Sequence, residues 1–235
     1  MLYCCACAHS FIRYTNVNTI SCSKLYKINP TLFVDYNCKR YSLLRNVIMV
    51  VFRSITEDEY KNEHMKFQQL YAFHETPFGK CLIAITDTDE DVIYLGFVED
   101  ENEALKILKQ KWPITKILKD NENKTKNIIE KIFHPDTSDL HSVCVLMKGT
   151  EFQIKVWKSL INIPKGTITT YEKIAQMIDN PRAAIAVGNA ISKNYIAYIV
   201  PCHRVKGKNG SNKYAWGVER KEALLEYESR HVHAT

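Results

Sequence analysis

The sequence has no run of eighteen or more apolar residues, so a helix that spans a membrane is not expected. It also lacks any strong bias in composition. Of its 235 residues, 46% are hydrophobic and 25% are charged, which is ordinary for a globular chain and argues against a fibre or a disordered protein. The length fits one large domain or two small ones.

Cysteine is scarce beyond residue 52. Five of the eight cysteines lie in the first 52 residues, and only Cys81, Cys144 and Cys202 are spread over the remainder. Three scattered cysteines cannot form a disulfide framework, which favours a reducing compartment. Cys4 and Cys7 have the spacing of half a zinc site, but no convincing second half follows, so we expect neither a metal nor a cofactor.

Residues 1–52 are poor in acids, with six Lys or Arg against one acid, and this loosely resembles an organelle transit peptide. The segment is rich in Asn and Tyr, however, and its start lacks the basic residues of a secretory signal. We expect a poorly ordered extension without chemistry, and Met49 or Met65 could equally begin the working protein. The compartment stays open between nucleus, bacterial cytoplasm and an organelle.

Charge divides the remaining chain into two parts. Residues 53–150 hold thirteen Lys or Arg against eighteen acids, whereas residues 151–235 hold thirteen against seven. A basic part joined to an acidic part is expected when only the basic part contacts a polyanion such as nucleic acid. With the element pattern below, this favours two domains, at residues 53–147 and 148–235.

The acidic part is predicted to be a small α+β unit. The stretch from "FQQLYAF" onward predicts a meander with a first strand, a turn at 77–79, and strands at about 80–86 and 92–98. Apolar residues at helical spacing then predict helices at 102–112 and 123–133. The excess of acids makes this part a poor candidate for contact with nucleic acid.

The basic part is predicted to be mainly helical. Thr150 and Gln153 predict a capping box at the start of a helix that ends near 164–166. Thr169 and Glu172 predict a second capping box before a helix at 171–178. Asn180 and the proline after it predict the N-cap and first residue of a third helix, at 182–194. Short helices joined by a tight turn have helix-turn-helix spacing.

The third predicted helix carries an apolar residue on its outer face. If Val187 and Ala190 point inward, Ile185 is exposed among polar neighbours that include Arg182. A single surface isoleucine is common and needs no function. The functional alternative is an apolar wedge that enters a base stack, helped by small residues that let the backbone come close.

Cys202 follows the apolar run "YIAYIVP", which predicts a short buried strand or extended segment that Pro201 ends. Buried cysteine is usually inert packing. Here His203 offers a base and Arg204 a cation, and both would favour the thiolate that attacks. Because adjacent side chains rarely meet head-on, a proton would reach His203 through a water. Glu228, on the apolar side of the last predicted helix, could orient His203 as the third member of a relay.

Four segments together resemble the O6-alkylguanine-DNA alkyltransferase family over residues 148–228: "GTEFQIKVWKSLINIPKGTITTYEKIA", "AVGNAISKN", "IVPCHRV" and "YAWGVERKEALLEYE". From "TPFGKCLIA" the chain resembles the N-terminal domain of that family more weakly. The resemblance implies an α+β fold, with a small ribonuclease-H-like α/β domain followed by a mainly helical domain that carries a helix-turn-helix. It also implies a monomer that binds the minor groove of double-stranded DNA.

The activity implied by the resemblance is direct DNA repair. The family rotates O6-alkylguanine out of the duplex and moves its alkyl group irreversibly to a cysteine, so that each molecule acts once without a cofactor. O4-alkylthymine stays open as a second substrate. Cys202 matches the alkyl acceptor, His203 the water-relayed base and Glu228 its orienting partner.

The resemblance implies further roles around this centre. Asn194 matches the asparagine that braces the helix-turn-helix against the active-site turn, and Tyr214 matches the tyrosine that binds the flipped guanine. Tyr171 matches the tyrosine that crowds the target phosphate and promotes rotation. Contacts with the DNA backbone are implied for Gln153, Glu172 and Asn180.

Two departures from the family pattern affect how a lesion reaches the cysteine. Ile185 stands where the family has the arginine that fills the space left by the flipped base, and Arg182, one turn earlier, is a partial substitute. We therefore expect weaker flipping from intact duplex. The loop between Val205 and Tyr214 is one residue shorter than the family pattern, which leaves the tolerance of larger alkyl groups open.

Two other functions stay open. A DNA-binding regulator without repair activity would explain Ile185 but not the intact Cys202. A cysteine hydrolase using Cys202, His203 and Glu228 would turn over on esters or amides. A phosphatase is disfavoured, because its C-x5-R loop would need arginine at Lys208.

Overall fold

The computed structural model of the protein describes residues 49–133, 142–208, 210 and 212–232. All described residues belong to one unit of the chain. Residues 1–48 of the expected extension lie outside the described residues. The expectation of poor order is wrong for residues 49–52, which form the start of β1 and pair with β6. Within the described ranges, no helix is long and apolar enough to cross a membrane.

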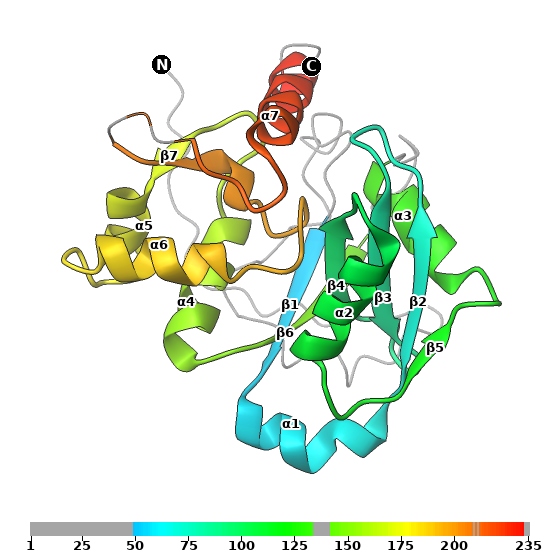
Figure 1. Ribbon diagram of the computed structural model, residues 1–235. Helices are drawn as coiled ribbons and strands as arrows, with labels where there is room; N and C mark the ends of the chain where they lie inside the picture. Colours follow the sequence, from blue (N-terminus) through cyan, green and yellow to red (C-terminus); the bar gives the residue numbers. More distant parts are fainter. Residues whose placement is uncertain (1–48, 134–141, 209, 211, 233–235) are drawn as a thin grey trace, which may run out of the picture. The chain divides into compact units, whose positions relative to one another are not determined.

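A six-stranded sheet forms the first half of the described chain (Figure 1). The predicted meander is confirmed, since β2, β3 and β4 pair antiparallel. Parallel pairing joins β1 to β6, β6 to β4 and β2 to β5, which the sequence did not predict. In spatial order the strands are β1 (Met49–Ile55), β6 (Ser142–Lys148), β4 (Val92–Phe97), β3 (Cys81–Thr86), β2 (Gln69–His74) and β5 (Ile117–Lys119).

Every residue of β3 and β4 is buried, which requires cover on both faces of the sheet. Helix α2 (Glu101–Lys111) packs on β3, and α3 (Lys124–Phe133) packs on β2, β3 and β6. Both helices confirm predictions to within about a residue at each end. A short helix α1 (Glu57–Glu63) and a 3-10 turn η3 (His64–Lys66) connect β1 to β2.

The second half is mainly helical and occupies the yellow-green to red part of Figure 1. The predicted capping box at Thr150 is confirmed, because Thr150 Oγ accepts from the Gln153 amide at 3.3 Å and Gln153 Oε1 accepts from the Thr150 amide at 3.0 Å. Its elements are α4 (Glu151–Ile161), β7 (Thr169–Thr170), α5 (Tyr171–Met177), α6 (Ala184–Ser192), the 3-10 turn η4 (Cys202–Arg204), β8 (Val205–Lys206) and α7 (Val218–Val232). The described chain is therefore a mixed α/β structure.

The joint between the two halves is tight at Gly149. A Cβ atom at this position would lie 2.6 Å from the ring of Trp157, so a side chain would force the ring or the backbone to move. Trp157 in turn donates from Nε1 to the Ala190 carbonyl at 2.9 Å. The end of β6 therefore packs directly against α4, and α4 is hydrogen-bonded to α6 through Trp157.

Two predicted helix caps are wrong, although α5 begins at Tyr171 as predicted. The N-cap of α5 is Thr170 and not Thr169, and its hydroxyl accepts from the Lys173 amide at 3.3 Å. Helix α6 begins at Ala184, and Ala183 holds the N-cap position without a side-chain cap. Asn180 is used differently, because its carbonyl accepts from the Ala183 amide at 2.9 Å and closes a turn before the helix.

The prediction of a strand or extended run before Cys202 is also wrong. Only one bridge, between Leu95 and Ile196, joins this segment to the sheet. Tyr198 then adopts a left-handed backbone with φ of 62°, and the chain folds into tight turns. The side chain of Asn194 holds these turns, because it accepts from the Ile196 amide at 3.0 Å and donates to the Val200 carbonyl at 3.0 Å.

Candidate active site

Cys202 is the first residue of the turn η4 and is buried, with 6% of its surface exposed. Its Sγ accepts a hydrogen bond from Asn194 Nδ2 at 3.1 Å, so the asparagine that shapes the preceding turns also contacts the sulfur. Burial raises the pKa of Cys202 to about 11, although the bond from Asn194 and the charge of Lys221 oppose this rise. The resting sulfur is therefore a thiol at neutral pH, and reaction requires removal of its proton.

His203 follows Cys202 in the sequence, and its side chain contacts Glu228. Its Nε2 is 3.0 Å from Glu228 Oε1, which confirms the predicted contact. Burial alone would raise the pKa of Glu228, but hydrogen bonds from His203 and Arg204 lower it to about 2. Because this carboxylate is ionised, Nε2 carries the proton and donates it.

The other ring nitrogen of His203 is left as an acceptor. Nδ1 is buried and has no hydrogen-bond partner among the described residues. Burial also lowers the pKa of His203, so the ring is neutral at rest. His203 thus holds the tautomer of a base, with a free lone pair on Nδ1 and an ionised carboxylate on Nε2 that would stabilise the protonated ring.

Arg204 does not act as the cation expected beside the sulfur. It binds Glu228 instead, with Nε 2.9 Å from Oε2 and Nη2 2.6 Å from Oε1, and Nη1 donates to the Ile163 carbonyl at 2.5 Å. The Gly166 amide also donates to Glu228 Oε2, at 3.2 Å. Arg204 therefore keeps the partner of His203 ionised and joins α7 to the end of α4.

Lys221 is a site residue that the sequence analysis missed. It is completely buried on α7, and its Nζ donates to the carbonyls of Val205 at 2.7 Å and Lys213 at 3.2 Å. Burial lowers the pKa of Lys221 to about 8, whereas its interaction with Cys202 raises it. The signal in the sequence was a lysine one turn before Leu224 and Leu225, on the apolar side of the predicted helix.

Two tyrosines flank the His203 ring. Tyr198 lies nearly parallel to it, with ring centres 6.1 Å apart and an angle of 6°, while Tyr214 meets it edge-on at 6.4 Å. The Tyr214 hydroxyl is buried and has no partner in the part of the chain that the structure describes. Burial raises the pKa of Tyr214 well above its usual value, so this hydroxyl is a neutral donor.

The pairing of β7 with β8 brings the start of α5 next to this centre, since Thr170 is aligned with Lys206. Tyr171 follows directly, half-buried, and an added Cβ at Gly188 of α6 would lie 3.8 Å from its ring. The structure therefore gathers Cys202, His203, Glu228, Asn194 and Tyr214 into one centre, with Tyr171 at its edge.

The other predicted DNA contacts lie on or near α4, α5 and α6. Asn180, Arg182 and Ile185 are exposed, and Ile185 reaches 85%. Gln153 is half-buried and already used in its capping box, while Glu172 lies in the first turn of α5. Among the described residues, no group of three or more His, Cys, Asp or Glu side chains could hold a metal ion.

Comparisons with known proteins match the sequence to the family that it was found to resemble. Residues 151–230 match the family described as 6-O-methylguanine DNA methyltransferase, DNA binding domain. A methylated-DNA–protein-cysteine methyltransferase of Methanosarcina acetivorans is 38% identical over 161 residues, which cover 67% of this chain and 97% of the relative. A probable methylated-DNA–protein-cysteine methyltransferase of Acanthamoeba polyphaga mimivirus is 36% identical over 158 residues, covering 67% of this chain and 95% of the relative.

Solved structures agree. The crystal structure of a Mycobacterium tuberculosis homologue named OGT, in complex with DNA, is 32% identical and aligns with a TM-score of 0.52 over 68% of this chain and 93% of that one. Because the two sequence relatives are matched over nearly their whole length, the chain belongs to the methylated-DNA–protein-cysteine methyltransferase family.

Proposed function

We propose that this protein repairs O6-alkylguanine in double-stranded DNA by moving the alkyl group to Cys202, once per molecule. The proposal rests on the arrangement of side chains around Cys202, in a chain that belongs to this family. A buried thiol is held by Asn194, beside a histidine whose free nitrogen is a base and whose other nitrogen binds an ionised carboxylate.

The first step is removal of the thiol proton. Nδ1 of His203 is the available base, and no hydrogen bond between Cys202 and His203 is present in the structure. We propose that a water carries the proton between them. The ionised Glu228 on Nε2 stabilises the imidazolium that results, and Asn194 Nδ2 donates to the developing thiolate.

The second step is transfer of the alkyl carbon. The Cys202 thiolate attacks this carbon, the bond between sulfur and carbon forms, and the bond from carbon to O6 breaks with its electrons moving to the guanine. We propose that the Tyr214 hydroxyl donates to the departing base, which is supported by its being buried and unpaired among the described residues. The product is a thioether, which water does not hydrolyse, so Cys202 is not regenerated.

The finer architecture supports this reading as part of the proposal. We assign residues 49–147, which begin with β1 and not at residue 53, to a ribonuclease-H-like domain. Residues 148–235 are the DNA-binding and alkyl-acceptor domain, with α5 and α6 as a helix-turn-helix. The protein would act as a monomer. Tyr171, Gln153, Glu172 and Asn180 would contact or crowd the DNA backbone, and Arg182 would partly substitute for the arginine missing at Ile185.

Flipping is required because the alkylated oxygen is inaccessible inside the stacked duplex. Ile185 projects from α6 and would enter the space that the flipped base leaves. An isoleucine fills this space but cannot hydrogen-bond the orphaned cytosine. We therefore propose that flipping from intact duplex is weaker than with an arginine at this position.

The test is to incubate the protein with an oligonucleotide duplex that contains one O6-methylguanine and to weigh the intact protein. A gain of one methyl group, absent in the Cys202→Ala variant, supports repair. An unchanged mass with retained DNA binding would instead support a regulator without chemistry. Turnover of esters or amides would support a cysteine hydrolase.

A further inference from the structure

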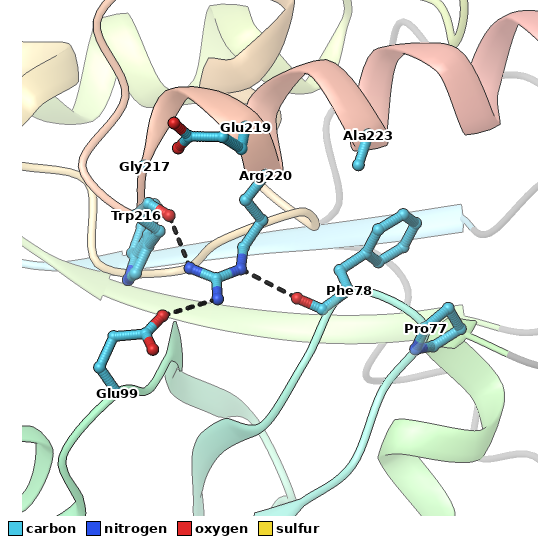
Figure 2. Close-up of a pocket in the computed structure, with 8 residues that line it drawn as sticks. All are labelled: Pro77, Phe78, Glu99, Trp216, Gly217, Glu219, Arg220 and Ala223. Carbon is cyan, nitrogen blue, oxygen red and sulfur yellow. Dashed lines mark hydrogen bonds and ion pairs between the residues drawn. The ribbon is translucent and has the colours of Figure 1, made fainter.

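Arg220, in the first turn of α7, joins three separate segments of the chain (Figure 2). Its Nε donates to the Phe78 carbonyl at 2.9 Å, Nη1 donates to the Trp216 carbonyl at 2.6 Å, and Nη2 lies 2.9 Å from Glu99 Oε1. The guanidinium also stacks over the Phe97 ring at 4.9 Å. Each of the three nitrogens of this planar cation therefore makes one bond to a different segment.

The three bonds differ in strength. Glu99 is 86% exposed, so its ion pair with Arg220 is screened by solvent. The Arg220 side chain itself is only 19% exposed, and its bonds to the two carbonyls are charge-assisted and partly shielded. The bonds that matter most hold the turn at Phe78 and the loop at Trp216.

Both held segments lead to His203 through contacts between rings. On one side, Trp216 contacts Tyr214 at 5.2 Å between ring centres, and Tyr214 contacts His203 at 6.4 Å. The loop that Arg220 holds is therefore the loop that carries Tyr214.

On the other side, Phe78 contacts Tyr198 at 6.0 Å, and Tyr198 lies parallel to His203 at 6.1 Å. The turn at Phe78 lies close to the guanidinium of Arg220. Gly79 has φ of 100°, so any other residue would strain the backbone here, and a Cβ would lie in contact with Arg220 Nη2 at 3.4 Å.

We propose that Arg220 is a positioning residue for alkyl transfer, which fixes Tyr214 and the His203 ring by joining the Trp216 loop to the Phe78 turn. This inference rests on the proposed function. Arg220 lies in a pocket lined by Pro77, Phe78, Glu99, Trp216, Gly217, Glu219 and Ala223, and it makes none of its bonds to α5 or α6. Its loss should therefore slow the chemical step and leave the binding of unmodified DNA unchanged.

The experiment measures two quantities for each variant: the single-turnover rate of methyl transfer at saturating protein, and the dissociation constant for unmodified duplex. Arg220→Ala should lower the rate by at least about tenfold, because small misplacements of reacting groups are costly, with the dissociation constant within about twofold of wild type. Arg220→Lys should fall between, since lysine keeps the charge but not the planar fork. Glu99→Gln should lower the rate less than about threefold.

The matched control is Arg230→Ala. Arg230 lies on the same helix and pairs with Glu226 at 2.5 Å, but its side chain is 73% exposed. This variant should transfer methyl at the wild-type rate. The folded fraction of every variant, measured by denaturant titration, separates slowed chemistry from lost structure.

The inference is overturned if Arg220→Ala and Arg220→Lys transfer at the wild-type rate, or if their rates fall only in proportion to the folded fraction. It is also overturned if the rate and the affinity for unmodified duplex fall together. Failure of wild type to accept a methyl group would instead refute the proposed function, so the two failures are distinguishable.

Discussion

Nε2 of His203 lies 3.0 Å from Oε1 of Glu228, and both side chains are completely buried. Hydrogen bonding keeps the carboxylate ionised and therefore fixes which nitrogen of the ring carries the proton. A carboxylate 25 residues away along the chain thus decides whether the residue next to Cys202 can be a base.

Replacing the Glu228 carboxylate should leave His203 poorly oriented as a base. Glu228→Gln keeps the shape but removes the charge, so we expect methyl transfer to slow by about 100-fold, the lower end of general-base contributions. The single-turnover rate on a methylated duplex measures this, with Glu226→Gln, an exposed glutamate on the same helix, as the control. An unchanged rate would remove Glu228 from the mechanism.

The same carboxylate should make the free energy of unfolding depend on pH in the acidic range. Its pKa is about 2 in the folded protein and about 4.5 in its ordinary state, so Glu228 stabilises the fold above pH 4.5 and this contribution is lost as the pH falls towards 2. The shift corresponds to about 3 kcal/mol of unfolding free energy. Denaturant titrations between pH 6 and pH 3 should show a steeper loss for wild type than for Glu228→Gln, and parallel curves would contradict this.

Lys221 should stabilise the loop in front of the site. Lys221→Met removes the donor to the carbonyls of Val205 and Lys213, and we expect a loss of about 1–3 kcal/mol of unfolding free energy. The variant should also disfavour the Cys202 thiolate below about pH 8, where Lys221 is charged in the wild type. Alkylation of Cys202 by iodoacetamide at pH 7 should therefore be slower in the variant, and an equal rate would contradict this.

Ile185 should limit access to lesions in intact duplex. Ile185→Arg adds a donor for the orphaned cytosine, so repair of methylated duplex should accelerate by about tenfold, as expected for one charged hydrogen bond. Arg182→Ala in the protein that keeps Ile185 should slow repair if Arg182 is a partial substitute for the missing arginine. Transfer from the free base, which needs no flipping, is the control, and comparable duplex rates for wild type and Ile185→Arg would count against the idea.

Local patterns in the sequence predicted much of the fold. The box at Thr150, the meander of β2 to β4 and the helices α2 and α3 depend on neighbours along the chain, and each is confirmed. The parallel pairing of β1 with β6 depends on residues about ninety positions apart, and no local pattern contains it. The turns before Cys202 were missed because the Asn194 side chain, rather than backbone propensity, shapes them.

The site divides in the same way. The exposure of Ile185 followed from helical spacing, which also put Glu228 on a side from which it could reach His203, and the structure has both. The partner of Arg204 and the buried position of Lys221 were not predicted, because each depends on how α7 packs against η4 and the loop after β8. The three bonds of Arg220 reach across the fold to residues as distant as Phe78 and could be found only in three dimensions.

The most direct test of the account is a titration with limiting protein. A duplex carrying labelled O6-methylguanine is given in excess, and label on the protein is counted and mapped by peptide. We predict a plateau at one methyl per molecule, all of it on Cys202, because the other described cysteines, Cys81 and Cys144, lie in strands β3 and β6 and not in the turn that carries His203. Turnover beyond one lesion per molecule, or methyl on a cysteine other than Cys202, would contradict the account.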